Sequence, residues 1–276
     1  MGPVKSKRIS VDLPCKMEIQ PMEDLKLLPD ELLELILSWV PSRTLVRRCR
    51  LVCRKWRDLI DRPTIWKLQW ERDPSKKATL EAAKHCPPMD WCRVGVLQPF
   101  GRNLIKNPCG KEQFRHWEVQ HGGDKWKVED NRGHVEGAEA QSCFVSSFLW
   151  CAKSQVIDLL KEGFWEELLD TYQPDIFISD WWCAREDCGY IYKIQVSLLA
   201  ADRTSVIAIF AVEPDPIPRW NDSKYQQISH VFRNYGPGVR YVYFKHAGRD
   251  SQYWAGHYGA RVTNSTVLVE FSPEPP

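Results

Sequence analysis

The sequence lacks the features that mark most membrane, secreted and metal-dependent proteins. Its 276 residues contain no apolar run of 18 or more and no amino-terminal signal peptide, so we expect neither a membrane span nor secretion. Ten cysteines occur without a regular framework and without a Cys-x-x-Cys pair, which argues against a structural zinc site. We therefore expect reduced thiols, no metal, no cofactor, and a cytoplasmic or nuclear location, of which we favour the cytoplasm.

An excess of charge of one sign is also missing. The 38 basic and 36 acidic residues give a net charge of +2, which favours neither nucleic acid nor a membrane surface as partner. Residues 43–57 are locally basic, but Glu31, Glu34, Asp58 and Asp61 lie close in sequence. We interpret this stretch as the solvated face of small helices and expect no nucleic-acid partner.

Motifs of catalysis are absent as well. The sequence has no Gly-x-Ser-x-Gly elbow, no phosphate-binding glycine loop and no His-Glu-x-x-His. Glu166 and Glu167 are adjacent, and adjacent helical residues do not face each other. His246 is better explained as a hydrogen-bonded structural residue of a strand. We expect no catalytic residue and no enzyme activity.

The amino-terminal residues 1–24 are polar, mixed in charge and without periodicity, which predicts disorder. The first six residues fit the N-myristoylation pattern. Pro3 directly after Gly2 counts against acylation, so the sequence leaves membrane association open.

Residues 28–60 form the most strongly patterned stretch. Leu28-Pro29 and the acidic Asp30-Glu31 are typical of a helix start, and Pro41 predicts its end. A second periodic run follows, with apolar residues at Leu45, Val46, Cys49, Val52, Cys53, Trp56, Leu59 and Ile60. The first run has more apolar residues than one core-facing stripe requires. The pattern fits equally a small module with an exposed docking surface and a helical hairpin buried in the rest of the chain.

The same stretch resembles the F-box motif almost position for position. The matching residues are Leu28-Pro29-Asp30-Glu31-Leu32, Ile36-Leu37, Leu45, Arg50 to Arg57 (RLVCRKWR) and Leu59-Ile60. The resemblance implies an F-box over residues 25–70, made of three short helices that dock on Skp1 and through it on cullin-1. It also implies that Leu28, Pro29, Leu32 and Ile36 lie at or near the Skp1 contact.

Residues 71–98 have the composition of a linker. Asp73-Pro74 and Cys86-Pro87-Pro88 interrupt the helical pattern on either side of a short predicted helix, residues 79–85. The prolines predict a stiff spacer, which would fix the direction in which the second domain points.

Residues 99–271 predict an antiparallel β-sandwich, and residues 272–276 a short tail. Alternating residues 190–198 indicate a half-buried strand. Residues 205–212 are apolar on both faces, which predicts a central strand. His121-Gly122-Gly123-Asp124 predicts a hairpin between residues 118–120 and 125–129. The fold class is therefore α+β: an all-α F-box, a helical linker and a C-terminal sandwich.

One loop near the end of the sandwich stands out chemically. Residues 248–259 (GRDSQYWAGHYG) place three aromatics and a histidine among three glycines. Aromatic rings held in a solvent-exposed loop match a sugar, which has C–H groups on one face and hydroxyls at its rim. The alternative is that Tyr253 and Trp254 only plug the end of the core.

Residues 102–271 resemble the F-box-associated domain of the sugar-recognising F-box proteins. The matching runs are Arg102-Asn103-Leu104, Asn107-Pro108-Cys109, His121 to Asp124, Trp165 to Asp170, Asp180-Trp181, Tyr253 to Gly256 and Gly259 to Ser265. The resemblance implies a ten-stranded, galactose-binding-like jelly roll that recognises the chitobiose core of high-mannose N-glycans on misfolded glycoproteins. Carried over by position, the implied glycan-binding residues are Phe148, Asp187, Tyr253, Trp254 and Ala255.

Two positions depart from the sugar-binding pattern. Ala255 stands where strong sugar binders of the family can carry lysine, and His257 where a tryptophan can occur. The F-box resemblance implies a substrate-recognition subunit of a Skp1–cullin–F-box ubiquitin ligase. The sequence therefore leaves a second hypothesis open, in which this ligase role is unchanged but the sandwich binds a protein segment. A more distant third is a free-standing lectin with a merely structural helical module.

Overall fold

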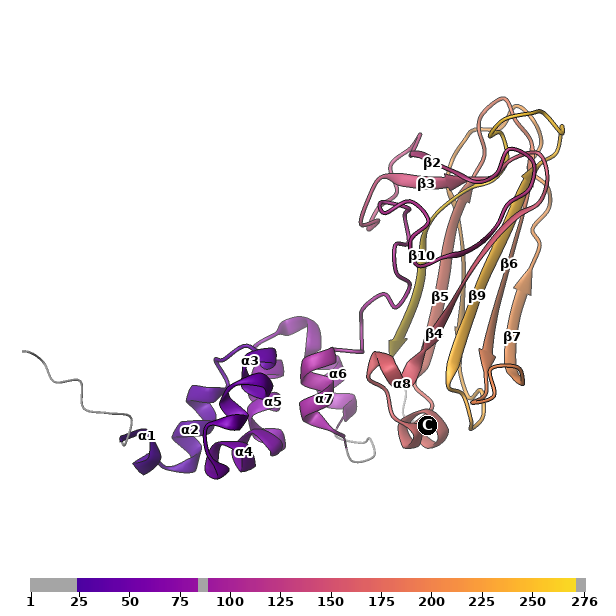
Figure 1. Cartoon of the computed structure of the whole chain (residues 1–276). Coiled ribbons are helices and arrows are strands. Elements are labelled where there is room, and N and C mark those ends of the chain that lie inside the picture. Colours follow the sequence, from indigo (N-terminus) through magenta and orange to yellow (C-terminus); the bar gives the residue numbers. More distant parts are fainter. Residues whose placement is uncertain (1–23, 84–88, 272–276) are drawn as a thin grey trace, which may run out of the picture.

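The computed structural model describes residues 24–83 and 89–271, which form a helical amino-terminal part and a β-sandwich (Figure 1). The expectations for residues 1–23, for the acylation pattern and for the tail 272–276 lie outside the described residues. No helix within the described ranges has the length and apolar content needed to cross a membrane.

The helical module consists of short helices joined by tight turns. They are α1 (Asp24–Leu27), α2 (Asp30–Leu37), α3 (Ser42–Arg47), a 3₁₀ turn (Cys49–Leu51), α4 (Arg54–Asp61) and α5 (Pro63–Glu71). The second periodic run is thus broken into α3, the turn and α4, because Arg48 and Cys53 leave the helical conformation. Cys53 begins α4 as its cap, with its Sγ accepting a hydrogen bond from the Trp56 N–H.

The core of this module is small and apolar. Leu33 and Leu37 of α2 are buried against residues of α3, α4 and α5, including Leu45, Ile60 and Trp66. The indole Nε1 of Trp66 donates to the Ile60 carbonyl at 2.8 Å, so its one polar atom is satisfied. Each fully buried leucine contributes about 1.5–3 kcal/mol of transfer free energy. The module therefore holds together by packing one face of α2 and leaves the other face free.

The linker is helical and packed on both sides. It contains a 3₁₀ turn (Pro74–Lys76), α6 (Lys77–Ala83) and α7 (Trp91–Leu97). Trp91 and Val96 of α7 pack on the module core, while Val94 joins Trp70 and Leu80 in a second small cluster against which Trp165 of the sandwich domain packs. The Arg93 guanidinium also donates to the Leu160 carbonyl. Packing of α7 on both domains therefore restricts the linker in addition to any stiffness that its prolines supply.

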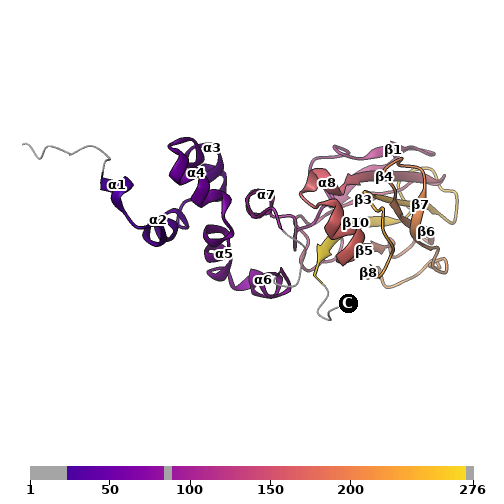
Figure 2. The same cartoon turned by 90° about the horizontal axis from the view of Figure 1, so that it is seen from below.

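The sandwich has two five-stranded antiparallel sheets in the described chain, as predicted (Figures 1 and 2). One sheet has the order β1 (Glu118–Gln120), β4 (Cys151–Asp158), β9 (Tyr241–Asp250), β6 (Tyr190–Leu199) and β7 (Val206–Val212). The other has the order β2 (Lys127–Asp130), β3 (Ser142–Val145), β10 (Arg261–Glu270), β5 (Asp175–Cys183) and β8 (Gln226–Phe232). The large core lies between them.

Two strand predictions are wrong. Strands β1 and β2 do not form a hairpin, because β1 pairs with β4 and β2 with β3 in the opposite sheet. The buried Trp126, whose indole donates to the Ala152 carbonyl, holds the crossing between the sheets. Strand β7 is not central: it is an edge strand paired with β6 alone.

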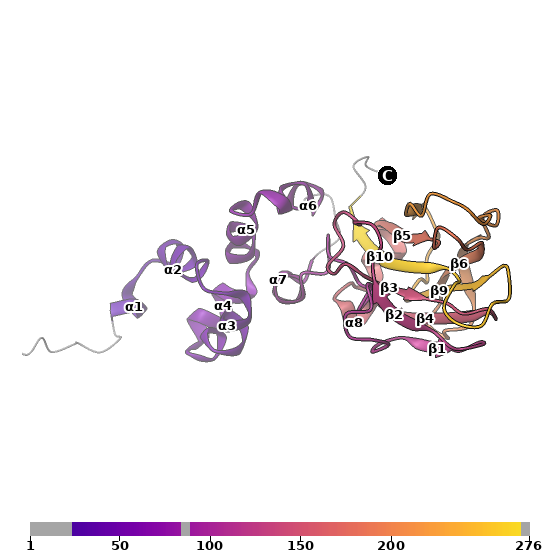
Figure 3. The same ribbon diagram turned by 90° about the horizontal axis from the view of Figure 1, so that it is seen from above.

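The two ends of the sandwich differ in structure. At one end lie α8 (Leu159–Glu162) and a π-helical turn (Leu168–Tyr172), close to the linker. The loops that follow β3, β5, β7 and β9 gather at the other end (Figures 1 and 3). Strand β9 spans the distance: its first residue, Tyr241, pairs with Asp158 next to α8, and its last, Asp250, leads into residues 251–260.

Candidate ligand-binding surfaces

Helix α2 presents an apolar face to solvent. Leu32 and Ile36 are each 48% exposed, and Leu35 lies beside them with similar exposure. Other exposed apolar residues of the module are Leu27, Trp39, Leu51 and Val52. This arrangement excludes the hairpin buried in the rest of the chain and agrees with a docking surface.

The four residues that the F-box resemblance places at or near the Skp1 contact differ in how exposed they are. Leu32 and Ile36 lie on the exposed face, and Pro29 is exposed as the cap of α2. Leu28 is half-buried against the module core, and its carbonyl accepts a hydrogen bond from Lys55 Nζ at 2.8 Å. Val52, predicted on the core face, is exposed because the chain leaves the helix at this point.

The loop after β9 is held by one buried carboxylate. Asp250 is fully buried and accepts hydrogen bonds from the backbone N–H groups of Tyr253 and Trp254. Tyr253 adopts a φ of 59°, in the left-handed region. The side chains of Tyr253 and Trp254 are 60% and 38% exposed, so they do not plug the core. The sequence folds here so that the backbone is fixed while the rings face solvent.

A second set of hydrogen bonds joins this loop to the loops after β1 and β3. The Gly256 N–H donates to an Asp124 carboxylate oxygen at 2.6 Å. Ser147 Oγ donates to the Gly256 carbonyl at 2.7 Å and accepts from the Asp124 N–H at 2.9 Å. Phe148, the next residue, is half-buried. These bonds place the loop that carries Phe148 beside the loop that carries Trp254.

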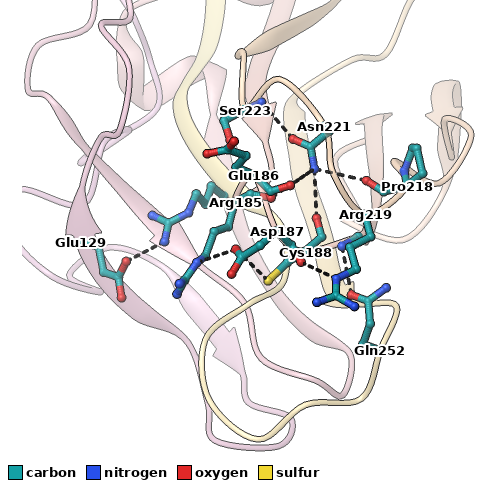
Figure 4. A network of polar contacts seen from close by, with 12 residues as sticks. Glu129, Arg185, Glu186, Asp187, Cys188, Pro218, Arg219, Asn221, Ser223 and Gln252 are labelled. Atoms are coloured by element: carbon teal, nitrogen blue, oxygen red, sulfur yellow. Dashed lines mark hydrogen bonds and ion pairs between the residues drawn. The ribbon is translucent and has the colours of Figure 1, made fainter.

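Asp187 lies in the loop after β5, within a polar network (Figure 4). Its carboxylate is 2.7 Å from Arg185 Nε. Desolvation raises the pKa of Asp187, but the Cys188 thiol hydrogen bond and the Arg185 charge outweigh it, so its pKa lies below its usual value. The side-chain amide of Asn221 lies within hydrogen-bond distance of the carbonyls of Arg185, Cys188 and Pro218. Asp187 is therefore an ionised acceptor on a rigid loop.

Arginines link these loops through the aromatic rings. Arg219 Nε donates to the Asp187 carbonyl at 3.1 Å, and its guanidinium lies 4.8 Å from the centre of the Trp254 ring. Arg249 lies 4.9 Å from the Tyr253 ring. Residues 146–150, 184–189, 213–225 and 251–260 together form what we call the loop cluster. The cluster thus combines exposed aromatics with cations, an arrangement that stabilises both.

Hydrogen bonds and the Arg219–Trp254 contact join the loops that carry Phe148, Asp187, Tyr253 and Trp254. Ala255 is exposed and has no polar side chain. Sequence reasoning missed Arg185, Arg219 and Arg249. The dipeptide Arg219-Trp220 after a proline-rich loop was the only signal for Arg219. Arg185 and Arg249 do have partners nearby in the sequence, Asp187 and Tyr253, but the sequence pattern does not show that these side chains meet.

The acidic, sulfur-containing and imidazole side chains are the possible metal ligands of the chain. Among the described residues, no three His, Cys, Asp or Glu side chains gather in a way that could hold a metal ion. His246 is buried, and its Nδ1 contacts the Asp180 carboxylate, which confirms its interpretation as a structural residue.

A helical module with a free apolar face, joined through a packed linker to a sandwich with exposed aromatic loops, defines a two-domain binding protein. Comparison with known families agrees with both halves. Residues 25–69 match the F-box-like family, and residues 95–269 match the F-box associated region. The chain belongs to the F-box proteins that carry an F-box-associated (FBA) domain.

Two of the similar proteins align with the chain over nearly the whole length of both sequences. The chain is 51% identical to F-box only protein 27 of Mus musculus, over 91% of this chain and 92% of the relative. It is 47% identical to F-box only protein 17 of Homo sapiens, over 92% and 95%. Among solved structures it is similar to TmCBM61 in complex with beta-1,4-galactotriose, with 13% identity, a TM-score of 0.42, and coverage of 62% of this chain and 100% of that one.

Proposed function

We propose that this protein is the substrate-recognition subunit of a Skp1–cullin–F-box ubiquitin ligase. In this proposal the helical module binds Skp1 and, through it, cullin-1. The loop cluster binds the chitobiose core of high-mannose N-glycans on misfolded glycoproteins in the cytoplasm, which are then ubiquitinated for ER-associated degradation. The protein acts by placement, because it raises the effective concentration of client lysines near the conjugating enzyme.

Family membership and the exposed face of α2 support the adaptor role. An apolar strip on a surface helix is costly in water and is typical of a protein-binding site. Leu32 and Ile36 face solvent while Leu33 and Leu37 complete the core, so the strip is not needed for folding.

The observation that carries the glycan proposal is the exposed pair Tyr253 and Trp254 on a backbone fixed by Asp250. An indole ring held in this way offers a flat apolar face to the C–H groups of a sugar. Asp187, ionised and at the same end of the sandwich, offers an acceptor for sugar hydroxyls. Phe148 supplies a further apolar surface on the adjoining loop.

A protein segment is the second candidate ligand, and two observations favour it. Ala255 supplies no charged donor, and a charged hydrogen bond is typically worth about 1.5–3 kcal/mol, or tenfold or more in affinity. The Arg219 guanidinium also lies over the Trp254 ring and competes with a sugar for that surface.

Replacing the central ring tests the glycan proposal. We expect Trp254→Ala in the full chain to lose binding to Man3GlcNAc2 by at least tenfold, with little change in melting temperature, because the exposed ring contributes little to the core. Trp39→Ala is the matched control: it also removes an exposed tryptophan that stacks with an arginine, but in the helical module. Titration calorimetry with the glycan measures both.

Absence of glycan binding by the unaltered protein would make a protein segment the better candidate. Equal losses for Trp254→Ala and Trp39→Ala would remove the loop cluster as the binding site. A joint fall in melting temperature and binding would instead assign Trp254 a structural role.

A further inference from the structure

The four edge strands of the two sheets differ in how well they are protected from pairing with another strand. Strand β1 has only three residues, and β2 carries Lys127, Glu129 and Asp130. Strand β8 presents polar side chains, among them Gln226, Gln227 and Ser229. Short length, charge and polarity are the usual means by which proteins keep free strand edges from pairing with another chain. In the described sheets, β7 is the edge that has none of these protections.

Strand β7 is long, uncharged and apolar throughout, with the sequence Val-Ile-Ala-Ile-Phe-Ala-Val. It pairs with β6 on one side and borders solvent on the other, as the outer margin of the sheet in Figure 1 shows. Phe210 and Val212 pack toward the core, whereas Ile209 is 56% exposed and Ala211 is also exposed. An uncovered strand of this composition has unpaired backbone groups and apolar side chains that favour a further strand.

We propose that this edge pairs with β7 of a second copy of the chain, antiparallel and centred on Ile209. About that residue Val206 would face Val212, Ile207 would face Ala211 and Ala208 would face Phe210, so every facing pair is apolar. Pairing on a two-fold axis uses one surface twice and closes after two copies. It would extend the five-stranded sheet across both copies and satisfy the free backbone groups of each β7.

Charge complementarity at the strand ends supports a second copy as the occupant. Antiparallel pairing about Ile209 brings residue 203 of one copy opposite residue 215 of the other, and 205 opposite 213. Arg203 is exposed in the turn before β7, with its guanidinium 4.8 Å from the Tyr241 ring. Glu213 and Asp215 are exposed and form no ion pair with another described residue. Arg203 lies in the β6–β7 turn with its guanidinium over Tyr241 of β9, so in the dimer it would leave that ring to pair with Asp215 of the other copy, once on each side of the two-fold axis.

The dimer would also have a functional consequence. Strand β7 includes neither the exposed face of α2 nor the loop after β9, so both surfaces stay available in each copy. Two loop clusters on one assembly would bind a client with two recognition sites more tightly than either cluster alone. The dimer itself does not depend on the proposed ligand.

Sedimentation velocity of the full chain over a range of concentrations tests the proposal. We expect a reversible monomer–dimer equilibrium. Ile209→Lys should raise the dissociation constant at least roughly tenfold, because the two-fold axis places two like charges opposite each other. Val156→Lys is the matched control, since Val156 is an exposed apolar residue of β4 in the same sheet but away from the edge. It should leave the equilibrium unchanged, and both variants should keep their melting temperatures.

Charge reversal tests the register. Arg203→Glu should weaken the dimer at least about fivefold, because the dimer loses this ion pair in both copies and gains a like-charge contact in its place. Combining it with Asp215→Arg should restore the original dissociation constant. Failure of this restoration, or an equal response to Ile209→Lys and Val156→Lys, overturns the proposed pairing.

Two further outcomes would contradict the proposed pairing of β7 with a second copy. Loss of the dimer in a Leu32→Asp, Ile36→Asp variant would assign self-association to the exposed face of α2. A wild-type protein that stays monomeric overturns the proposal. If such a monomer shows slower amide exchange in β7 only on adding an extended apolar peptide, the edge is a peptide site instead.

Discussion

Among single residues, two ionisable side chains, Asp180 and Lys153, are completely buried in the sandwich core. Asp180 accepts hydrogen bonds from Tyr192 Oη at 2.6 Å and Ser265 Oγ at 2.8 Å, and it also contacts His246. Lys153 Nζ lies 3.3 Å from the centre of the Trp117 ring and has no hydrogen-bond partner among the described residues. Desolvation lowers the pKa of Lys153 well below its usual 10.5, although Asp180 acts in the opposite direction.

Replacing Lys153 by methionine should therefore change how stability depends on pH. The folded protein binds a proton at Lys153 more weakly than the unfolded chain, so stability rises with pH between the lowered folded-state pKa and 10.5. The rise can reach about 1.36 kcal/mol per pH unit. Denaturant unfolding between pH 7 and pH 10 should show this rise in the wild type and less of it in Lys153→Met. Parallel curves would mean that the amine is not titrating in this window.

The sequence indicates some of the candidate surface residues better than others. Tyr253 and Trp254 could be predicted because aromatics crowded among glycines in a loop have little reason to serve the core. The exposed half of α2 could be predicted from an excess of leucine over one stripe. The role of Arg219 could not, because its aromatic partner Trp254 comes from another loop and only the folded sheets bring the two together.

At the scale of single elements, β7 shows why strand order is hard to predict. Its composition is that of a central strand, and the sequence has no local signal that only β6 would pair with it. The same limit applies to β1 and β2, whose intervening turn is typical of a hairpin although the strands join different sheets. Strand β5 was not predicted, since its side chains are mostly buried on both faces and its alternation is weak. Strand propensity is local, whereas pairing is set by the whole chain.

The close packing of helix α7 on Trp66 leads to a testable prediction at this scale. A Cβ atom on Gly95 would overlap Cε3 and Cζ3 of Trp66, a side chain that is completely buried and has no room to move. In a helix, Gly→Ala normally stabilises by up to about 1 kcal/mol. Gly95→Ala should instead destabilise the helical module by roughly 1–3 kcal/mol, because overpacking outweighs the gain in helix propensity.

Chemical denaturation provides the measurement, and Gly133→Ala provides the control. Gly133 is exposed, and a methyl group at its Cβ position would have no neighbouring atom within 4 Å, so its replacement should change stability little. A Gly95→Ala protein as stable as the wild type would show that α7 does not pack closely on Trp66.

At the scale of the whole molecule, the two surfaces lie at opposite ends. Helix α7 contacts the sandwich beside α8, and the loop cluster lies at the far end of β9. Ten residues of strand extend about 30 Å. A ligand bound by the loop cluster would therefore be separated from the helical module by the length of the sandwich, and the packed linker sets the direction between them (Figure 1).

This separation implies that the two binding activities are independent. Leu32→Asp with Ile36→Asp places charge on the exposed face of α2 without touching the core of the module. We expect this variant to lose Skp1 binding at least roughly a hundredfold and to keep any ligand binding by the loop cluster, because burying an unpaired charge in an interface is strongly unfavourable. Trp254→Ala should keep Skp1 binding unchanged.

The most direct measurement is the affinity of purified Skp1 for the wild-type chain, the Leu32→Asp, Ile36→Asp variant and Trp254→Ala, determined side by side. We predict tight binding by the wild type and by Trp254→Ala, and none by the α2 variant in a protein that still melts cooperatively. Undiminished Skp1 binding by a folded α2 variant would contradict the assignment of this helix face to the ligase.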